Sequence, residues 1–385
     1  MNKRFIPRGT ILRAFALVVV PVLLGTAGFV QGLSAQQPPP QDQQQPQNRP
    51  PQQQNNADAQ VTVVPVQGNI SMLVGAGGNI LVSVPPPGAG RGRVPASQQE
   101  RGEFGVLLVD SGLAPMSDKV RAAVRTLSNQ PIRYIINTHV HPDHVGGNAA
   151  LAAPPAAAGR GGRGGGAPAL VLAHETVLAR MSEGEGNQPA APQAAWPTDA
   201  YLDQKDMWFN NESIQVIHAP NAHTDGDSIV YFRRSDVVAA GDFYVTTSFP
   251  ILDTQHGGTI NGIVDALNKI LDITIAANNE EGGTLVIPGH GRISDEADVA
   301  EYRNMTVIVR DRIQDLVKKG MTLEQVKAAK PTLDYDYRYG GTPTSFWNTE
   351  KFVTAVYNDL AKTAAPKTAT PSQTPGRGPG RSGTK

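Results

Sequence analysis

The sequence predicts an α/β fold, a four-layer sandwich in which two mixed β-sheets are flanked by helices. Strand and helix patterns alternate along the chain, two strands near residue 75 form a hairpin, and the helices carry apolar residues along one side only. Mixed strand and helix order with hairpins is typical of two sheets that are covered by helices.

The first part of the domain is rich in strands. It contains a hairpin, a strand, a helix and another strand, at Ile70–Val74 with Ile80–Val84, Gly105–Val109, Asp118–Leu127 and Ile132–Asn137. The hairpin strands flank a Gly-Ala-Gly-Gly turn. Ser117 is the expected N-cap of the helix, because serine oxygens accept hydrogen bonds from free N–H groups at helix starts.

The second part alternates strands with longer helices. Strands are predicted at Leu170–Ala173, Ile214–His218, Ser228–Phe232, Val237–Ala240 and Thr284–Ile287. Helices are predicted from about Glu175 onward and at Ile260–Asp272, Asp295–Lys319, Leu323–Ala329 and Glu350–Ala361. Thr322 and Gln325 have the spacing of a capping box.

The N-terminal residues differ in composition from this domain. Residues 1–35 carry four basic residues, no acidic residue and an apolar run at Ala14–Val30. This pattern predicts an export signal that is cleaved after about Ala35, with a retained membrane anchor as the alternative. Of the 19 residues Gln36–Gln54, 16 are Gln or Pro, so residues 36–58 are expected to form a disordered linker.

The folded domain is therefore expected at residues 59–363, with the functional motifs in 65–292 and C-terminal helices in 293–363. Two stretches rich in Gly, Pro and Ala inside it are expected to be inserted loops, Pro85–Glu103 and Ala153–Ala169. Residues 364–385 are expected to form a disordered basic tail.

Charge and cysteine content exclude several functions. Of the 34 Lys and Arg residues, four lie in the signal and four in the tail, which leaves 26 against 34 Asp and Glu, a net charge of −8 for residues 36–363. An acidic domain argues against nucleic-acid binding, because Lys and Arg supply most of the non-specific affinity for phosphates. The absence of cysteine excludes disulfides, thiolate nucleophiles and thiolate metal ligands. We expect a small-molecule substrate and no stable membrane insertion after cleavage.

The segment THVHPDHVGGN at residues 138–148 carries four metal-ligand side chains within six positions. His139 and His141 fall on the same side of an extended chain, so they can share one ion. The proline that follows forces a turn, which directs Asp143 and His144 toward a neighbouring position. Such a dense group directly after a strand predicts a metal site.

Three later motifs add ligand-type residues: His223 in NAHTDGD, Asp242 in AAGD and His290 in PGHG. Each lies close to the end of a predicted strand, where rigid scaffolds hold functional groups. A His or Asp beside Gly is commonly a turn residue, but the order of the three motifs along the chain strengthens each of them.

Taken together, these motifs resemble those of the metallo-β-lactamase-fold superfamily over roughly residues 65–292. THVHPDHVGGN is similar to its His-x-His-x-Asp-His signature, and the later motifs are similar to those of its second histidine, its bridging acid and its last histidine. The resemblance implies that fold, with two zinc ions per chain. The implied ligands are His139, His141 and His223 for one ion and Asp143, His144 and His290 for the other, with Asp242 bridging both.

Three further residues are candidates for supporting roles. Asp110, in VLLVDSG, resembles an acid that orients a ligand histidine in this superfamily, and Asp227 is a weaker candidate for the same role. A turn or capping role is the alternative for both. Tyr244 alternates back to the side of Asp242 along an extended strand and is a candidate oxyanion donor, with packing on the sheet as the alternative.

The ligand types determine the expected chemistry. Imidazole and carboxylate groups without thiolate suit zinc and also admit iron or manganese. Two ions about 3.5–4 Å apart can share a hydroxide, because metal binding lowers the pKa of water from about 15.7 toward 7. The expected reaction is attack of this bridging hydroxide on a carbonyl, with Asp143 orienting it and helping to move its proton.

The sequence thus predicts an exported, periplasmic or secreted dinuclear zinc hydrolase that acts on an ester, lactone, thioester or other cyclic carbonyl compound. By the resemblance, the bridging Asp242 favours the glyoxalase-II-like and lactonase-like members, because true β-lactamases usually carry Cys or Ser there. β-Lactam hydrolysis is one alternative. The others are persulfide-type oxidation by one iron ion, at His139, His141, His223 and Asp242, and a non-catalytic metal-binding periplasmic module.

Overall fold

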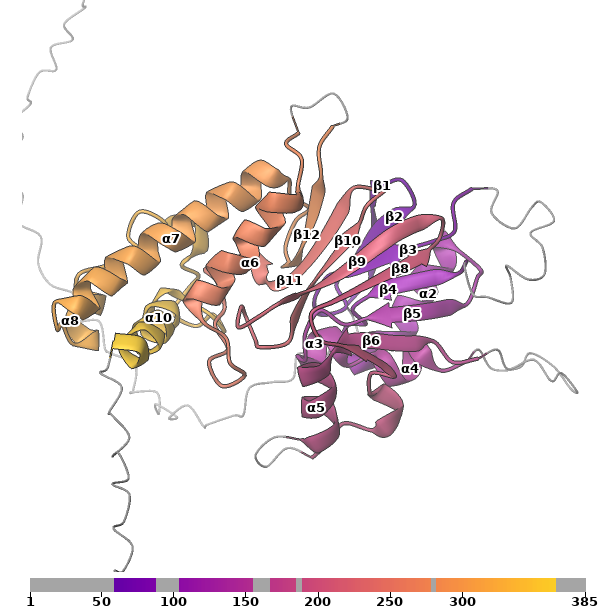
Figure 1. Cartoon of the computed structure of the whole chain (residues 1–385), viewed down its shortest axis with the longest axis horizontal. Coiled ribbons are helices and arrows are strands. Elements are labelled where there is room, and N and C mark those ends of the chain that lie inside the picture. Colours follow the sequence, from indigo (N-terminus) through magenta and orange to yellow (C-terminus); the bar gives the residue numbers. More distant parts are fainter. Residues whose placement is uncertain (1–58, 88–103, 155–166, 185–188, 278–281, 365–385) are drawn as a thin grey trace, which may run out of the picture. The chain divides into compact units, whose positions relative to one another are not determined.

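Two β-sheets lie face to face in the protein and helices cover their outer faces, so the predicted α/β sandwich is confirmed (Figure 1). The computed structural model describes residues 59–87, 104–154, 167–184, 189–277 and 282–364. All of them belong to one compact unit, Gln53–Lys385. The predicted signal, the predicted linker, nearly all of the predicted basic tail and most of both predicted inserted loops lie outside the described residues. Among the described helices, none has the length and apolar character needed to span a bilayer.

The first sheet has seven strands, which pair in the order of the chain. They are β1 (Thr62–Gln67), β2 (Ile70–Val74), β3 (Ile80–Ser83), β4 (Val106–Val109), β5 (Ile132–Ile136), β6 (Leu170–His174) and β7 (Asp199–Tyr201). Strands β1 to β4 pair antiparallel, whereas β4 to β7 pair parallel. Because β4 and β5 are parallel, their carboxyl ends meet at one edge, where Asp110 and the His-rich loop follow them.

The second sheet has five strands in the order β12-β11-β10-β9-β8. They are β8 (Gln204–Phe209), β9 (Glu212–Ala219), β10 (Asp227–Phe232), β11 (Val237–Val245) and β12 (Leu285–His290). Strands β8 to β11 form an antiparallel meander, and β11 pairs parallel with β12. Val245 is opposite His290 in that pair, so Asp242 and His290 approach the same edge.

Helices cover both outer faces of the pair of sheets (Figure 1). Between strands of the first sheet, the chain forms α2 (Ser117–Leu127), α3 (Pro142–Val145), α4 (Asn148–Ala152) and α5 (Glu175–Glu183). The later helices are α6 (Ile260–Ile273), α7 (Glu296–Lys318), α8 (Leu323–Ala328), α9 (Asp336–Tyr339) and α10 (Thr349–Ala364). Short 3-10 helices lie at Ala114–Met116 and Gln193–Ala195.

Strand alternation divides the core into three layers. In β4, Leu107 and Val109 face the second sheet, whereas Val106 and Leu108 face α2 and α4. In β11, Val237 and Ala239 face the first sheet. Val238 and Ala240 instead pack with residues of α6, α7 and α10. Burial of both faces explains the nearly continuous apolar runs of these strands.

Local predictions were wrong at a few positions. Strands β1 and β8 were not predicted, because β1 contains Pro65 and β8 alternates exposed polar residues at the edge of its sheet. Ser117 does not cap α2, because a 3-10 turn precedes it, and its hydroxyl donates to the carbonyl of Ala114 at 2.8 Å. The capping box of Thr322 and Gln325 is confirmed.

A buried carboxyl lies at the start of β9. Glu212 is 1% exposed and accepts hydrogen bonds from the backbone N–H and the hydroxyl of Ser235, both at 3.1 Å. Burial raises the pKa of Glu212 by more than these hydrogen bonds lower it.

The Glu212→Gln variant tests whether the pKa of Glu212 is raised in the folded protein. A raised folded pKa means that the stabilising contribution of Glu212 is complete below its unfolded value of 4.5 and is lost as the pH rises through the folded value. The glutamine variant should therefore gain stability relative to the wild type between pH 4 and pH 8. Denaturant unfolding across this range measures the difference, and a difference independent of pH would contradict the prediction.

Candidate metal centre

The seven predicted ligands converge at one edge of the sandwich from both sheets. The loop after β5 and the start of α3 supply His139, His141, Asp143 and His144. The loop after β9 supplies His223, and β11 and β12 supply Asp242 and His290. The site thus depends on the packing of the two sheets against each other.

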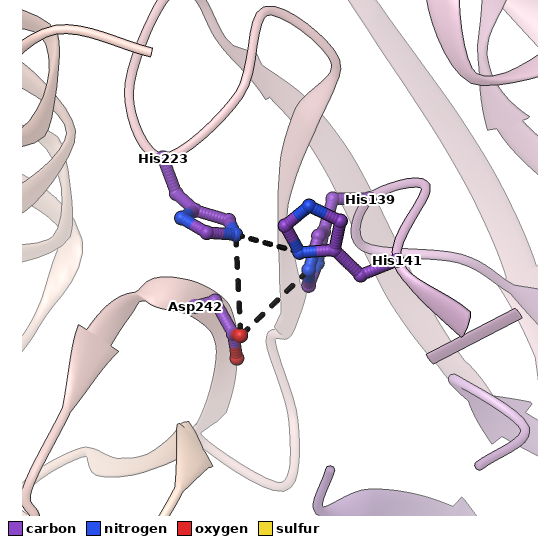
Figure 2. Close-up of side chains that lie close together, drawn as sticks. All are labelled: His139, His141, His223 and Asp242. Atoms are coloured by element: carbon purple, nitrogen blue, oxygen red, sulfur yellow. Dashed lines mark hydrogen bonds and ion pairs between the residues drawn. The ribbon is translucent and has the colours of Figure 1, made fainter. Parts of the chain in front are cut away.

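One group contains His139, His141, His223 and Asp242, whose ligand atoms lie within 4.8 Å of one another (Figure 2). His223 Nε2 is 3.0 Å from His141 Nδ1. Asp242 Oδ2 is 3.8 Å from His139 Nε2 and 4.0 Å from His223 Nε2. Ligand atoms around a tetrahedral zinc ion lie roughly 3.3 Å apart, given metal–nitrogen distances of about 2.0–2.1 Å. These spacings suit one metal ion.

A second group contains Asp143, His144 and His290. His290 Nε2 is 3.1 Å from Asp143 Oδ2, and it is 3.5 Å from Asp242 Oδ1. His144 Nε2 is 3.2 Å from the same Asp242 oxygen. Asp242 therefore directs Oδ2 toward the first group and Oδ1 toward the second, as a bridging ligand would.

Buried atoms without hydrogen-bond partners support the fit to metal ions. His139 Nε2, His144 Nε2 and Asp242 Oδ1 are buried and make no hydrogen bond with the described residues. An orphaned buried polar atom costs about 1–3 kcal/mol, so three that converge fit a place where a metal ion is bound. Burial lowers the pKa of His139, and it lowers the pKa of His223 to about 4, which keeps both rings in the neutral form that binds metals.

The acidic ligands are ionised. Burial alone would raise the pKa of Asp242, but His144 and the other histidines around it bring this pKa well below its ordinary value. Burial also opposes the lowered pKa of Asp143, which results mainly from its hydrogen bond with His290. Both carboxylates are therefore available to cations at neutral pH.

Asp110, the candidate for orienting a ligand histidine, lies beneath the centre and contacts the ligand-bearing loop. Its Oδ2 accepts a hydrogen bond from His144 Nδ1 at 2.7 Å. The same oxygen accepts from the hydroxyl of Thr138 at 2.8 Å, and this hydroxyl is 3.0 Å from His139 Nδ1. Asp110 thus orients His144 directly and His139 through Thr138.

Two other predicted residues lie away from the metal-facing atoms. Asp227 accepts hydrogen bonds from the backbone N–H and hydroxyl of Thr224, so it takes the turn role and holds the loop next to His223. Tyr244 is 1% exposed and packs against Tyr302 in the core. The prediction that it faces the site is wrong, because β11 bulges between Gly241 and Val245 and the simple alternation of side chains is broken there.

Asp253 and His256 are site residues whose contacts the sequence did not predict. Asp253 Oδ2 accepts a hydrogen bond from His141 Nε2 at 2.8 Å and another from His256 Nδ1. Asp253 Oδ1 accepts from the backbone N–H of His256 at 3.1 Å. His223 Nδ1 donates to the carbonyl of Ile251 in the same loop at 2.8 Å.

These contacts fix the tautomers of the ligands. In four of the ligand histidines, one ring nitrogen lies against a protein oxygen and the other is left for a metal ion. These are His139, His141, His144 and His223. In the sequence around Asp253, the only feature that could have indicated its role at the site is His256, three residues later.

Two glycines allow the backbone to lie close to metal-ligand side chains. A Cβ at Gly289 would lie 2.0 Å from Asp242 Oδ1, and one at Gly78 would lie 2.3 Å from His144 Cε1. Neither distance is sterically tolerable.

A large cavity opens beside both groups. Its volume is about 1550 Å³, and His141, Asp143 and His290 line it. Their side chains are 25%, 30% and 32% exposed, whereas those of His139 and His144 are fully buried. A small molecule can therefore reach the centre from this cavity.

Comparisons with known proteins agree with this arrangement. A model of the metallo-beta-lactamase superfamily matches residues 101–290. The linear primary-alkylsulfatase of a Pseudomonas species is 23% identical over 264 residues, which are 58% of this chain and 47% of that protein. The chain thus spans about half the length of this curated relative.

Solved structures with similar folds were also found. A double mutant of a sec-alkyl sulfatase has a TM-score of 0.53 at 15% identity, over 79% of this chain and 50% of that one. A metallo-beta-lactamase from Pontibacter korlensis has a TM-score of 0.45 at 15% identity, over 64% of this chain and 99% of that one. At this identity, the sec-alkyl sulfatase supports the fold alone.

Residues 101–290 of the chain belong to the metallo-β-lactamase superfamily. The resemblance inferred from its motifs is confirmed, and all seven candidate ligands lie within the matched residues. The fold and the ligand groups together define a candidate metal-binding site of this superfamily.

Replacement of Gly289 by alanine should disrupt the centre. The new Cβ displaces the Asp242 carboxylate, so we expect Gly289→Ala to bind fewer metal ions per chain than the wild type after dialysis. Gly320→Ala is the control, because Gly320 has a positive φ but no atom within 4 Å of an added Cβ. The control should lose about 1–2 kcal/mol of stability and keep its metal. Full metal content in Gly289→Ala would contradict the prediction.

Asp253→Ala should weaken metal binding without unfolding the protein. Loss of an acceptor behind a ligand histidine commonly costs about 10–100-fold in metal affinity, and we expect a loss of this size for one of two ions. Competition with a chromophoric chelator measures it. Asp315→Ala, at an exposed acid on α7, is the matched control. Equal affinities in the two variants would show that Asp253 does not orient His141.

Proposed function

We propose that this protein is an exported hydrolase that uses two divalent metal ions, most simply zinc, to cleave an ester-type bond in a small molecule. The observation that carries the proposal is the orientation of Asp242, which directs one carboxylate oxygen toward each ligand group. A carboxylate in this orientation suits a pair of ions better than a single one.

The candidate ligands form two sets, one for each ion. One ion would be held by His139, His141 and His223 with Asp242 Oδ2, and the other by Asp143, His144 and His290 with Asp242 Oδ1. When bound, such ions activate water at neutral pH and polarise the bond that is cleaved. Nitrogen and carboxylate ligands without sulfur are consistent with zinc, and also with manganese or iron.

Asp143 would act on the proton of the attacking water. It lines the cavity, its side chain is 30% exposed, and its lowered pKa keeps it ionised. An ionised carboxylate accepts hydrogen bonds only, so Asp143 orients the water through an oxygen and receives its proton.

Carbonyl esters, lactones and thioesters are the first substrate class that we propose. Sulfate esters are a second candidate, because the curated relative is described as an alkylsulfatase and a structural neighbour as a sec-alkyl sulfatase. Among the described residues that line the cavity, Lys351 alone supplies a permanent positive charge. β-Lactams and persulfides are the remaining substrate classes to be tested.

Export is part of the proposal and rests on the sequence of residues 1–35. Their basic start and apolar run at Ala14–Val30 are typical of a signal that directs a protein to the periplasm or outside the cell.

Metal analysis and a substrate panel on the full chain test the proposal. We expect close to two zinc ions per chain and hydrolysis of at least one ester, lactone or thioester. His141→Ala should lose at least 10²-fold in kcat/KM, because the first ion loses a ligand. Chelation should abolish activity, and zinc should restore it.

Other outcomes would redirect the assignment. A folded protein that binds no metal would refute the proposal. One iron ion per chain with thiol-dependent oxygen uptake would support a persulfide oxidoreductase. Selective cleavage of β-lactams or of alkyl sulfates would replace the carbonyl-ester class. A metal-loaded protein without turnover of any panel member would indicate a non-catalytic binding module.

A further inference from the structure

The cavity extends far beyond the metal ligands. Its volume of about 1550 Å³ exceeds the roughly 300–1,000 Å³ that is usual for small-molecule sites. At the end remote from the ligands it is lined by residues of the segment Gly341–Asn348 and by the start of α10. The reacting group of a substrate fills only a part of this space.

An aromatic ring stands exposed on this remote wall. Phe346 lines the cavity, yet it is 83% exposed. The apolar side chains of Pro343 and Trp347 also line the cavity, as does Leu252, which lies in the loop that hydrogen-bonds to two ligand histidines. The metal end of the cavity is thus lined by ionisable ligands, whereas the other end combines these apolar side chains with Glu350 and Lys351, whose Nζ lies 5.8 Å from the centre of the Phe346 ring.

The turn that carries Phe346 is held by several hydrogen bonds. The N–H of Thr342 donates to the hydroxyl of Ser345 at 2.9 Å, and the side chain of Asn348 donates to the carbonyl of Pro343 at 3.2 Å. Lys351 Nζ donates to the carbonyl of Ser345 at 3.2 Å. The turn therefore fixes the backbone that carries the ring before any ligand binds.

A further hydrogen bond joins this wall to the metal centre. Trp347 Nε1 donates to the carbonyl of Pro250 at 3.1 Å. Within the next three residues of that loop, the carbonyl of Ile251 accepts from His223 and the carboxylate of Asp253 accepts from His141. The apolar wall and the two ligand histidines are thus attached to the same short segment, which fixes the distance between them.

We propose that Phe346, with Trp347 and Pro343, forms a subsite for an alkyl or aryl group of the substrate, whose ester-type bond lies at the metal end of the same cavity. This inference rests on the proposed hydrolase function. Covering an exposed ring with an apolar group lowers the free energy of the complex, and a turn that is already hydrogen-bonded loses little backbone entropy when this happens. The natural substrate is therefore an ester-type compound that carries an apolar group of several carbon atoms.

A series of p-nitrophenyl esters from acetate to octanoate, hydrolysed by the zinc-loaded full chain, tests this subsite. For the wild type, kcat/KM should rise about threefold for each added CH₂ over the first few. In Phe346→Ala the ratio of octanoate to acetate activity should fall about tenfold. Tyr337→Ala is the matched control, because Tyr337 is 87% exposed but does not line the cavity, and its ratio should equal that of the wild type.

Binding of the product acids separates the subsite from the reaction. Acetate and octanoate have the same carboxylate, so a difference in their affinity reports the chain alone. Titration calorimetry should show tighter octanoate binding to the wild type and to Tyr337→Ala, and a loss of this preference in Phe346→Ala. An equal octanoate preference in all three proteins would overturn the subsite, whether or not the esters are hydrolysed. A Phe346-dependent preference without hydrolysis of any ester would support the subsite and refute the proposed reaction.

Discussion

The buried carboxylate of Asp110 is the interaction on which the site depends. It lies where β4 ends, and it receives hydrogen bonds from His144 and Thr138 of the loop that follows the neighbouring parallel strand β5. A one-residue shift between β4 and β5 would separate these partners and turn the ligands away. Asp110 has a φ of 67°, a left-handed conformation that residues other than glycine rarely adopt, so the fold accepts local strain to direct this carboxylate.

The two sheets share the work of holding the ligands. The first sheet orients His139 and His144 through Asp110, and the loop after β11 orients His141 and His223 through Asp253 and Ile251. The apolar layer between the sheets therefore has a second role besides stability, because it sets the spacing of ligands that lie far apart in the sequence. The bridging orientation of Asp242 depends on that spacing.

Much of the fold and most of the ligand set could be predicted from the sequence, because their signals are local. The His-rich segment is contiguous, and the buried strands are continuous apolar runs. The role of Asp253 depends instead on a long-range contact, in which its N–H donates to the carbonyl of His223 at 3.0 Å. No pattern within LDTQHGG indicates that contact. Tyr244 was misplaced for a related reason, since a bulge is defined by the partner strand and not by the strand's own sequence.

The turn around Phe346 has an evolutionary consequence. It belongs to the segment between α9 and α10, whereas every candidate metal ligand lies between residues 139 and 290. Insertions or substitutions in the turn can therefore change which molecules are accepted while the catalytic groups stay the same. The proposed substrate-binding turn and the candidate metal ligands thus lie in different parts of the sequence. This arrangement allows the same reaction to be adapted to new compounds by small and independent changes.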